Sequence, residues 1–365
     1  MPAASGVLGK CLPALDIAAV LVYICSMQLK VQGGTRRNMR RTVHLCVSSH
    51  EEIMYRDEED LIMGFNCLAF AVLETESRLL GEGFMTTHNH KLVQTDSAVA
   101  LSQKDRYAYS RYFNAKYSRS GRLGEKYVFE VEVSGIHHTT VALNYVLRQG
   151  LHHGLVATPF GYPHCSVNAF FRKDLGKVVT PELIADSCRY KFTPNRKVLP
   201  SCYRMASNGL IMREDIVDTA YVEELYVTPR NFLFQMNRIT DETIVQEQAE
   251  ESALPPVTIE TIEQGVSAFN IKEALSGELG RVDRSVLTDL DLCRLIDTVY
   301  LRSFLKESEK QSIYCISPQK RAELGNMLWR DIGQGRLQSI MPAEMRSQVS
   351  GRKASVAQIR RCLAL

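Results

Sequence analysis

Residues 79–93 read LLGEGFMTTHNHKLV, and this stretch determines the expected fold. Its two halves, 79–85 and 88–93, have the length and apolar content of short strands, and Thr86-Thr87 would join them. On a strand, residues two positions apart point to the same face, so the imidazoles of His88 and His90 could bind one metal ion together. Asn89 would point to the opposite face. Because such pairs also occur in strands without a metal, the surrounding elements are needed to decide whether this pair is a metal site.

The segments around this hairpin alternate between strand and helix patterns. Strands are expected at residues 42–47, 79–85, 88–93 and 127–133, and helices with apolar residues at helical spacing at 58–73 and 101–117. This order is typical of a ferredoxin-like α+β fold, with one antiparallel sheet and helices on one face. A further helix, 139–149, follows this unit, and Gly150 would end it.

The helix at 139–149 places a tyrosine and an amide on one face. Tyr145 and Gln149 are four residues apart and therefore lie one above the other. Both could face the histidine pair, although a half-buried aromatic and a solvated helix end would give the same spacing. His137-His138 and His152-His153 flank this helix and are interpreted as surface residues.

Several short motifs follow one another along residues 42–171 in the order found in one known protein family. They are the Phe-Met before the histidine pair, Ser110-Arg111-Tyr112-Phe113-Asn114, Arg119-Ser120-Gly121-Arg122-Leu123, Tyr145 with Gln149, His153-Gly154-Leu155-Val156 and Tyr162-Pro163-His164-Cys165-Ser166. As an ordered set they resemble the HUH transposases that use one catalytic tyrosine, in particular those associated with repetitive extragenic palindromes. The resemblance covers about 130 of the 365 residues.

The resemblance implies a function and a set of site residues. It places the metal ligands at His88, His90 and Gln149 and the nucleophile at Tyr145, with Mg²⁺ or Mn²⁺ as the cofactor. The implied activity is that of a DNA strand transferase, an endonuclease and transposase that cuts and rejoins single-stranded or hairpin DNA. Its products are a 5′-phosphotyrosine linkage and a free 3′-hydroxyl. A monomer and a homodimer both remain open, because some members of the family share the tyrosine helix between subunits.

Three positions depart from the family pattern. The residue between the histidines is hydrophobic in the family and is Asn89 here, and a buried amide without a partner costs about 1–3 kcal/mol. The dipeptide before the histidines is Thr86-Thr87 in place of Pro-Asn or Ser-Asn, and Gln149-Gly150 replaces the Asn-Pro that ends the tyrosine helix. None of these changes removes a catalytic group, but together they also fit a copy that binds hairpins and no longer cuts.

Basic and aromatic residues alternate between residues 104 and 126. Phosphates pair with such cations and unstacked bases lie on such rings, as in proteins that bind single strands. We expect some of the aromatic residues to be buried and the loop from Arg119 to Arg122 to contact DNA. The candidate DNA-binding residues are Lys104, Arg106, Arg111, Lys116, Arg119 and Arg122.

The rest of the chain divides by composition. Residues 1–38 are expected to be a leader or extension, 39–171 the nuclease-like domain, and 172–264 a connecting region. Residues 241–263 hold seven acidic residues and no basic one, which is typical of a solvated linker. Residues 265–365 are expected to be helical, either a helix-turn-helix that binds DNA or a helical scaffold.

Whole-chain composition sets broad limits. The chain is 45% hydrophobic and 23% charged with a formal net charge of +3, values that are ordinary for a soluble globular protein. Its ten cysteines include no Cys-x-x-Cys pair, so they suggest neither a zinc ribbon nor a redox pair, and their scatter favours reduced thiols in the cytoplasm. No membrane partner is expected. An RNA-binding ferredoxin-like module is a further alternative, but it would place its aromatic residues on the strands.

Overall fold

A four-stranded antiparallel sheet forms the centre of the protein. The computed structural model describes residues 40–49, 51–177, 181–237, 285–305, 312–333 and 351–365, with a few positions between 254 and 264. The strands are β1 (Arg41–Ser48), β2 (Arg78–Phe84), β3 (His88–Thr95) and β4 (Phe129–Val133), in the spatial order β2-β3-β1-β4. Residues 1–38 and most of the expected acidic linker lie outside the described residues.

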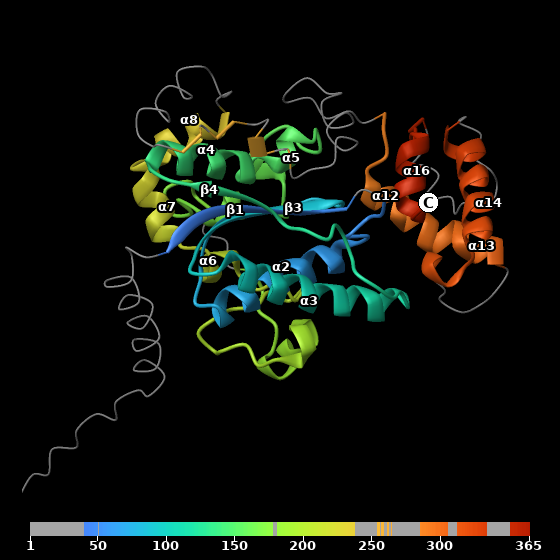
Figure 1. Cartoon of the computed structure of the whole chain (residues 1–365), viewed down its shortest axis with the longest axis horizontal. Coiled ribbons are helices and arrows are strands. Elements are labelled where there is room, and N and C mark those ends of the chain that lie inside the picture. The colour runs from blue at the N-terminus through green and yellow to red at the C-terminus, as the bar shows by residue number, and fades with distance from the viewer. Residues whose placement is uncertain are drawn as a thin grey trace, which may run out of the picture. The chain divides into compact units, whose positions relative to one another are not determined.

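Two long helices, α2 (Glu58–Glu74) and α3 (Ala98–Tyr117), pack together on one face of this sheet (Figure 1). Each begins where a side chain caps the first turn: Asp57 accepts from the backbone N–H of Asp60, and Ser97 accepts from that of Ala100. The element order and the strand order are those of a ferredoxin-like fold, so the expected α+β class is confirmed.

The opposite face of the sheet is covered by α4 (Ile136–Leu147) and α5 (Gln149–His152) (Figure 1). Gly81 and Gly83 lie two residues apart on β2, so they share the face toward α4. A Cβ atom at Gly83 would lie 2.7 Å from the carbonyl oxygen of Val146, and one at Gly81 would lie 2.5 Å from the Leu143 side chain. The two glycines therefore allow the backbone of α4 to approach the sheet.

The segment at 172–264, which was expected to connect the two domains, packs against the hydrophobic core around the sheet. Its elements are η3 (Asp186–Phe192), η4 (Pro194–Arg196), α6 (Arg213–Ile216), α7 (Thr219–Tyr226) and α8 (Pro229–Asn237). The backbone N–H of Asp218 donates to the carbonyl of Leu79 at 2.8 Å, and Arg213 Nε donates to Glu82 Oε1 at 2.6 Å. These contacts place residues 213–218 beside β2, at the outer edge of the sheet. The segment is therefore part of the same packed unit as the sheet.

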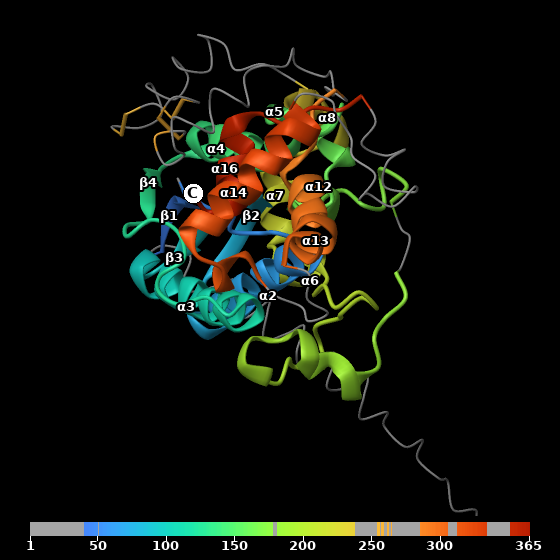
Figure 2. The same ribbon diagram turned by 90° about the vertical axis from the view of Figure 1, so that its right-hand side faces the viewer.

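The C-terminal region is helical, as expected, and has a hydrophobic cluster of its own. Its helical elements are α12 (Asp289–Leu295), η5 (Ile296–Tyr300), α13 (Leu301–Leu305), η6 (Ile313–Cys315), α14 (Pro318–Leu328), η7 (Trp329–Gly333) and α16 (Val356–Leu363). The side chain of Ser317 caps α14 ahead of Pro318, and Ser355 with Gln358 forms the expected capping box at α16. Helices α14 and α16 lie side by side (Figure 2).

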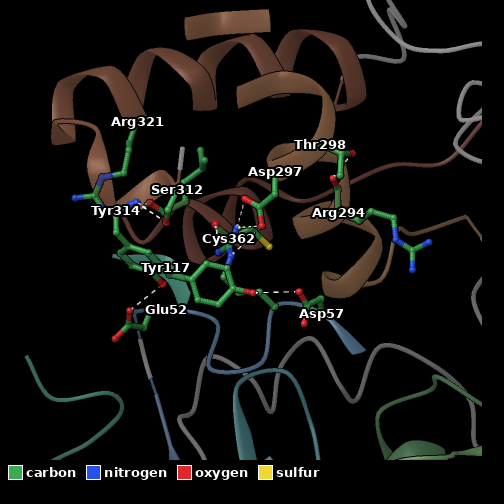
Figure 3. Close-up of polar contacts among 12 residues, drawn as sticks. Glu52, Asp57, Tyr117, Arg294, Asp297, Thr298, Ser312, Tyr314, Arg321 and Cys362 are labelled. Atoms are coloured by element: carbon green, nitrogen blue, oxygen red, sulfur yellow. Dashed lines mark hydrogen bonds and ion pairs between the residues drawn. The ribbon is translucent and has the colours of Figure 1, made fainter. Parts of the chain in front are cut away.

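The loop at residues 51–57 contacts both hydrophobic clusters. Ile53 belongs to the cluster of the C-terminal helices, whereas Met54 and Tyr55 belong to the cluster around the sheet. On the loop, Glu52 accepts a hydrogen bond from the hydroxyl of Tyr314 at 3.1 Å (Figure 3). No helix among the described residues combines the length and apolar character needed to cross a membrane.

Candidate active site

The two histidines of the hairpin lie on the face of the sheet that α4 covers. The ring centroid of His90 lies 5.0 Å from that of His88 and 5.0 Å from that of Tyr145. Both histidines are buried, at 1% and 0% exposure. The alternation of β3 therefore brings this pair to the tyrosine, as the sequence predicted.

Each histidine uses one ring nitrogen for a hydrogen bond and leaves the other unpaired. Nδ1 of His88 lies 3.0 Å from Oγ1 of Thr87, and Nδ1 of His90 lies 3.0 Å from Nε2 of His44. Nε2 of both His88 and His90 is buried without a hydrogen-bond partner among the described residues. Histidines that bind metals commonly have this arrangement, in which a partner at one nitrogen orients the other toward the ion.

Gln149 adds a third unpaired atom beside the pair. Its Nε2 donates to the carbonyl of Tyr145 at 3.2 Å, while its Oε1 is buried and has no partner in the described structure. Gly83 of β2 lies directly against this side chain: a Cβ atom at Gly83 would be 3.2 Å from Cγ of Gln149. The amide side chain is thus held between β2 and the turn that follows Tyr145.

Gly150 does not end the helix, so this prediction was wrong. Helix α4 ends at Leu147, and Gln149 and Gly150 begin the short helix α5. A Cβ atom at Gly150 would lie 2.4 Å from Cβ and Cγ of Tyr162. This glycine is therefore explained by the close packing of Tyr162, whose hydroxyl donates to the carbonyl of Phe84 at 2.6 Å.

Asn89 has a partner on the other face of the sheet. Its Nδ2 donates to the hydroxyl of Tyr55 at 2.6 Å, and the residue is buried at 3% exposure. The Tyr55 ring packs edge-on against Phe84. The amide nitrogen of Asn89 is thus accommodated by a hydrogen bond to the loop at 51–57, while its Oδ1 is buried without a partner among the described residues.

The site also contains histidines that the sequence analysis did not place there. The His44 ring is stacked on that of His90 at 5.1 Å between centroids, and the His153 ring lies 5.0 Å from that of His88. His153 was expected at the surface, but its Nε2 is buried, and His138 is fully buried as well. The one available signal was a histidine within the otherwise apolar run 43–47.

Burial keeps the site histidines neutral. It lowers the pKa of His44 to about 3, with the positive charge of Lys91 adding to the shift. It lowers the pKa of His88 to about 4, with a hydrogen-bonding interaction with the Gln149 side chain acting against the shift, and it lowers the pKa of His90 well below the usual histidine value. The ring nitrogens are therefore available as metal ligands well below neutral pH.

We expect the free energy of unfolding without metal to decrease below about pH 6.5. In the unfolded chain a histidine binds a proton near pH 6.5, whereas in the folded chain the pKa values of His44 and His88 are about 3 and about 4. The unfolded state then binds more protons, so each residue contributes a loss of roughly 1.4 kcal/mol per pH unit between about pH 6 and pH 4. Urea unfolding at several pH values measures this slope. A His88→Gln variant with the same slope as the parent would contradict the assignment.

The residues present fit a divalent ion. Nε2 of His88, Nε2 of His90 and Oε1 of Gln149 are all buried and unpaired in the described part of the chain. The described residues contain no group of three or more His, Cys, Asp and Glu side chains that could hold a metal, so the amide would have to be the third ligand. Two imidazoles and one amide oxygen suit an ion such as Mn²⁺ better than they suit an ion that prefers oxygen alone.

Three of the six predicted DNA-binding residues form ion pairs within the chain. Lys104 pairs with Glu74 at 2.9 Å, and Arg119 Nε donates to Glu52 at 3.0 Å. Lys116 lies 2.8–2.9 Å from three carboxylates, those of Asp57, Glu59 and Asp60. The positive charge counted along residues 104–126 is thus partly neutralised by acidic residues from α2 and the loop before it.

The other three have no ion pair within the described ranges. Arg106 donates to the carbonyl of Lys126 at 3.2 Å, and the guanidinium of Arg111 lies 5.6 Å from the ring centroid of Tyr107, which is 64% exposed. Arg122 is exposed. Tyr109, Phe113 and Tyr117 are buried, so α3 has the expected mixture of buried and exposed aromatic residues. Helix α3 lies on the face of the sheet opposite α4 (Figure 1).

Comparison with known proteins gives one weak similarity. No protein-family model matches the chain, and no curated protein matches it. Among solved structures, a REP-associated tyrosine transposase bound to a REP hairpin is similar, with a TM-score of 0.32 and 10% identity. The similarity covers 39% of this chain and 82% of that one. At this level the activity of the neighbour is not transferred to this chain.

Proposed function

We propose that this chain is a metal-dependent, transposase-like DNA strand transferase that cleaves and rejoins single-stranded or hairpin DNA with Tyr145 as its nucleophile. The observation that supports the proposal is the set of unpaired atoms beside that tyrosine: Nε2 of His88, Nε2 of His90 and Oε1 of Gln149. The Tyr145 ring lies 5.0 Å from the His90 ring, so nucleophile and ligands are adjacent. DNA as the substrate class follows from the family resemblance of residues 42–171.

The residues would divide the reaction between them. The Tyr145 Oη forms the new bond to phosphorus while the bond from phosphorus to the 3′ oxygen breaks. The phenol loses one proton and the departing 3′ oxygen gains one, which leaves a 5′-phosphotyrosine and a free 3′-hydroxyl. A divalent ion held by His88, His90 and Gln149 would stabilise the charge that develops on the phosphate oxygens. Because the covalent linkage retains the bond energy, the same steps in reverse rejoin the strand.

Tyr145 is buried at 7% exposure, so a strand has to displace the side chains that cover it. The half-buried ring of His152 lies 5.8 Å from the Tyr145 ring. His152 comes from α5, a helix of only four residues. Entry of the DNA strand is therefore expected to move this end of the site rather than the sheet.

The test is a covalent adduct with DNA. The full chain is incubated with labelled single-stranded hairpin DNA and Mn²⁺ and then run on a denaturing gel. An adduct that disappears with chelator is the expected result. DNA binding without an adduct would favour the alternative of a copy that binds hairpins and does not cut. If the chain neither binds the hairpin DNA nor forms an adduct, the proposed strand transferase and the alternative of a non-cutting hairpin-binding copy are both contradicted.

Gln149 gives a second, sharper test of the metal site. Changing Gln149 to Glu keeps its length and supplies an anionic ligand, so metal affinity should be kept or improved. Changing it to Leu removes the ligand oxygen, so the metal concentration needed for cleavage should rise about 10–100-fold. Titration of Mn²⁺ in the adduct assay measures this, with Gln103→Leu on the exposed face of α3 as the control. A Leu variant with the parental requirement would show that Gln149 is not a ligand.

The charge pairing on α3 and in the loop that follows it predicts which cations contact DNA. Replacing Arg111 and Arg122 by Ala should weaken binding of single-stranded DNA and reduce the slope of log K against log salt by about 1.4, or about 0.7 per phosphate contact. Lys104→Ala should change the slope much less, because that lysine is already paired with Glu74. Fluorescence anisotropy at several salt concentrations measures both. Equal slopes in the parent and the double variant would place this surface away from DNA.

A further inference from the structure

We propose that His44 is a positioning residue that orients His90 for metal binding. The inference rests on the proposed function, because it concerns the ligands of that site. His44 lies on β1 and His90 on β3, and these strands are antiparallel neighbours. Nε2 of His44 lies 3.0 Å from Nδ1 of His90. The two residues are 46 positions apart in the sequence, so only the register of the sheet brings them together.

The position of the shared proton follows from the chemistry of the ligand. A metal needs the lone pair of Nε2 of His90, so the ring proton of His90 has to be on Nδ1. Nδ1 then donates to Nε2 of His44, which requires that His44 carry its own proton on Nδ1, an atom that is buried without an acceptor among the described residues. His44 is thus the acceptor for His90, as the hydroxyl of Thr87 is positioned to be for His88.

Packing restricts the same rings. The imidazoles of His44 and His90 are stacked with an interplanar angle of 22°, and the Tyr145 ring meets them edge-on, at 79° and 84°. His44 and His90 are both 0% exposed. A change at His44 would therefore leave the Nδ1–H of His90 without an acceptor in a place where water is excluded, and the ring could turn away from the metal.

Two substitutions separate the hydrogen bond from the packing. His44→Gln places an amide oxygen close to the position of Nε2 and keeps an acceptor for His90. His44→Leu keeps an apolar side chain of useful size and removes the acceptor. We expect the Leu variant to bind Mn²⁺ about 10–100-fold more weakly than the parent, as for other partners of metal ligands, and the Gln variant to stay within about threefold. His164→Leu removes another buried histidine, one that pairs with Glu58, and should bind as the parent does.

The measurement is metal binding by the full chain without DNA. Calorimetric titration with Mn²⁺ gives the affinity, and the absorption spectrum of bound Co²⁺ reports the ligand geometry, which should change in the Leu variant and be restored in the Gln variant. Parental affinity in the Leu variant, equal losses in the Leu and Gln variants, or no metal binding by the parent would each overturn the proposal. The adduct assay is separate. A parent that binds metal with this pattern of variants but forms no adduct would refute the proposed cleavage and support the role of His44.

Discussion

Replacing Tyr145 by Phe is expected to abolish the covalent adduct with DNA, a loss on the order of 10³-fold or more. The change removes only the nucleophilic oxygen. The ring that packs edge-on against His44 and His90 remains, so the fold and the metal site should be unaffected. DNA affinity should stay close to the parental value, because the predicted DNA-binding cations lie elsewhere. Denaturing gels measure the adduct, and anisotropy measures the affinity.

The control for this variant is a second tyrosine in the same domain. Tyr112 lies on α3, and its hydroxyl donates to Asp60 at 3.3 Å on the other side of the sheet, so Tyr112→Phe should still form the adduct. An adduct that persists in Tyr145→Phe and disappears in Tyr112→Phe would show that the wrong tyrosine has been assigned. Loss of metal binding in Tyr145→Phe would show instead that the ring itself supports the ligands.

The parts of the site that the sequence predicted depend on local geometry. Strand alternation alone puts His88 and His90 on one face of the sheet. Helical spacing predicted that Tyr145 and Gln149 lie on one face of a helix. The structure ends α4 at Leu147, between this second pair, yet the side chain of Gln149 still donates to the carbonyl of Tyr145. The fold class was also predictable, because it follows from the order of strand and helix patterns.

The parts that were missed depend on contacts between distant segments. His44 reaches His90 only through the register of β1 with β3, and Asn89 finds its partner in Tyr55, from a loop without regular structure. Charge counted along residues 104–126 did not include the acidic residues of α2 that pair with Lys116. No rule of short-range spacing predicts such pairings.

The loop that holds Tyr55 also joins the sheet to the C-terminal helices. The next residue, Arg56, is 1% exposed. Its Nη2 lies 2.9 Å from Asp297 Oδ1, and its Nη1 donates to the carbonyl of Cys362 at 2.8 Å. Asp297 and Cys362 come from different helices and lie close together (Figure 3). On the other side of the loop, the backbone N–H groups of Met54 and Tyr55 donate to the carbonyl of Thr86, two residues before His88.

Replacing Arg56 by Met should therefore lower the free energy of unfolding by about 1–3 kcal/mol, the usual cost of leaving a buried hydrogen-bonding group without its partner, because Asp297 is 31% exposed and can be hydrated in the variant. Asp297 and the carbonyl of Cys362 would lose their donor, while the volume of the side chain is roughly kept. Urea unfolding measures the loss. Arg204→Met is the control, because Arg204 is 41% exposed and its pairing with Asp215 should contribute only about 0–1 kcal/mol. The loop is also hydrogen-bonded to Thr86 and Asn89, close to the ligand His88. Mn²⁺ affinity should therefore fall in the Arg56 variant and not in the control. A variant as stable as the parent would mean that Arg56 does not join the C-terminal helices to the sheet, and normal metal affinity in a destabilised variant would mean that the loop does not position β3.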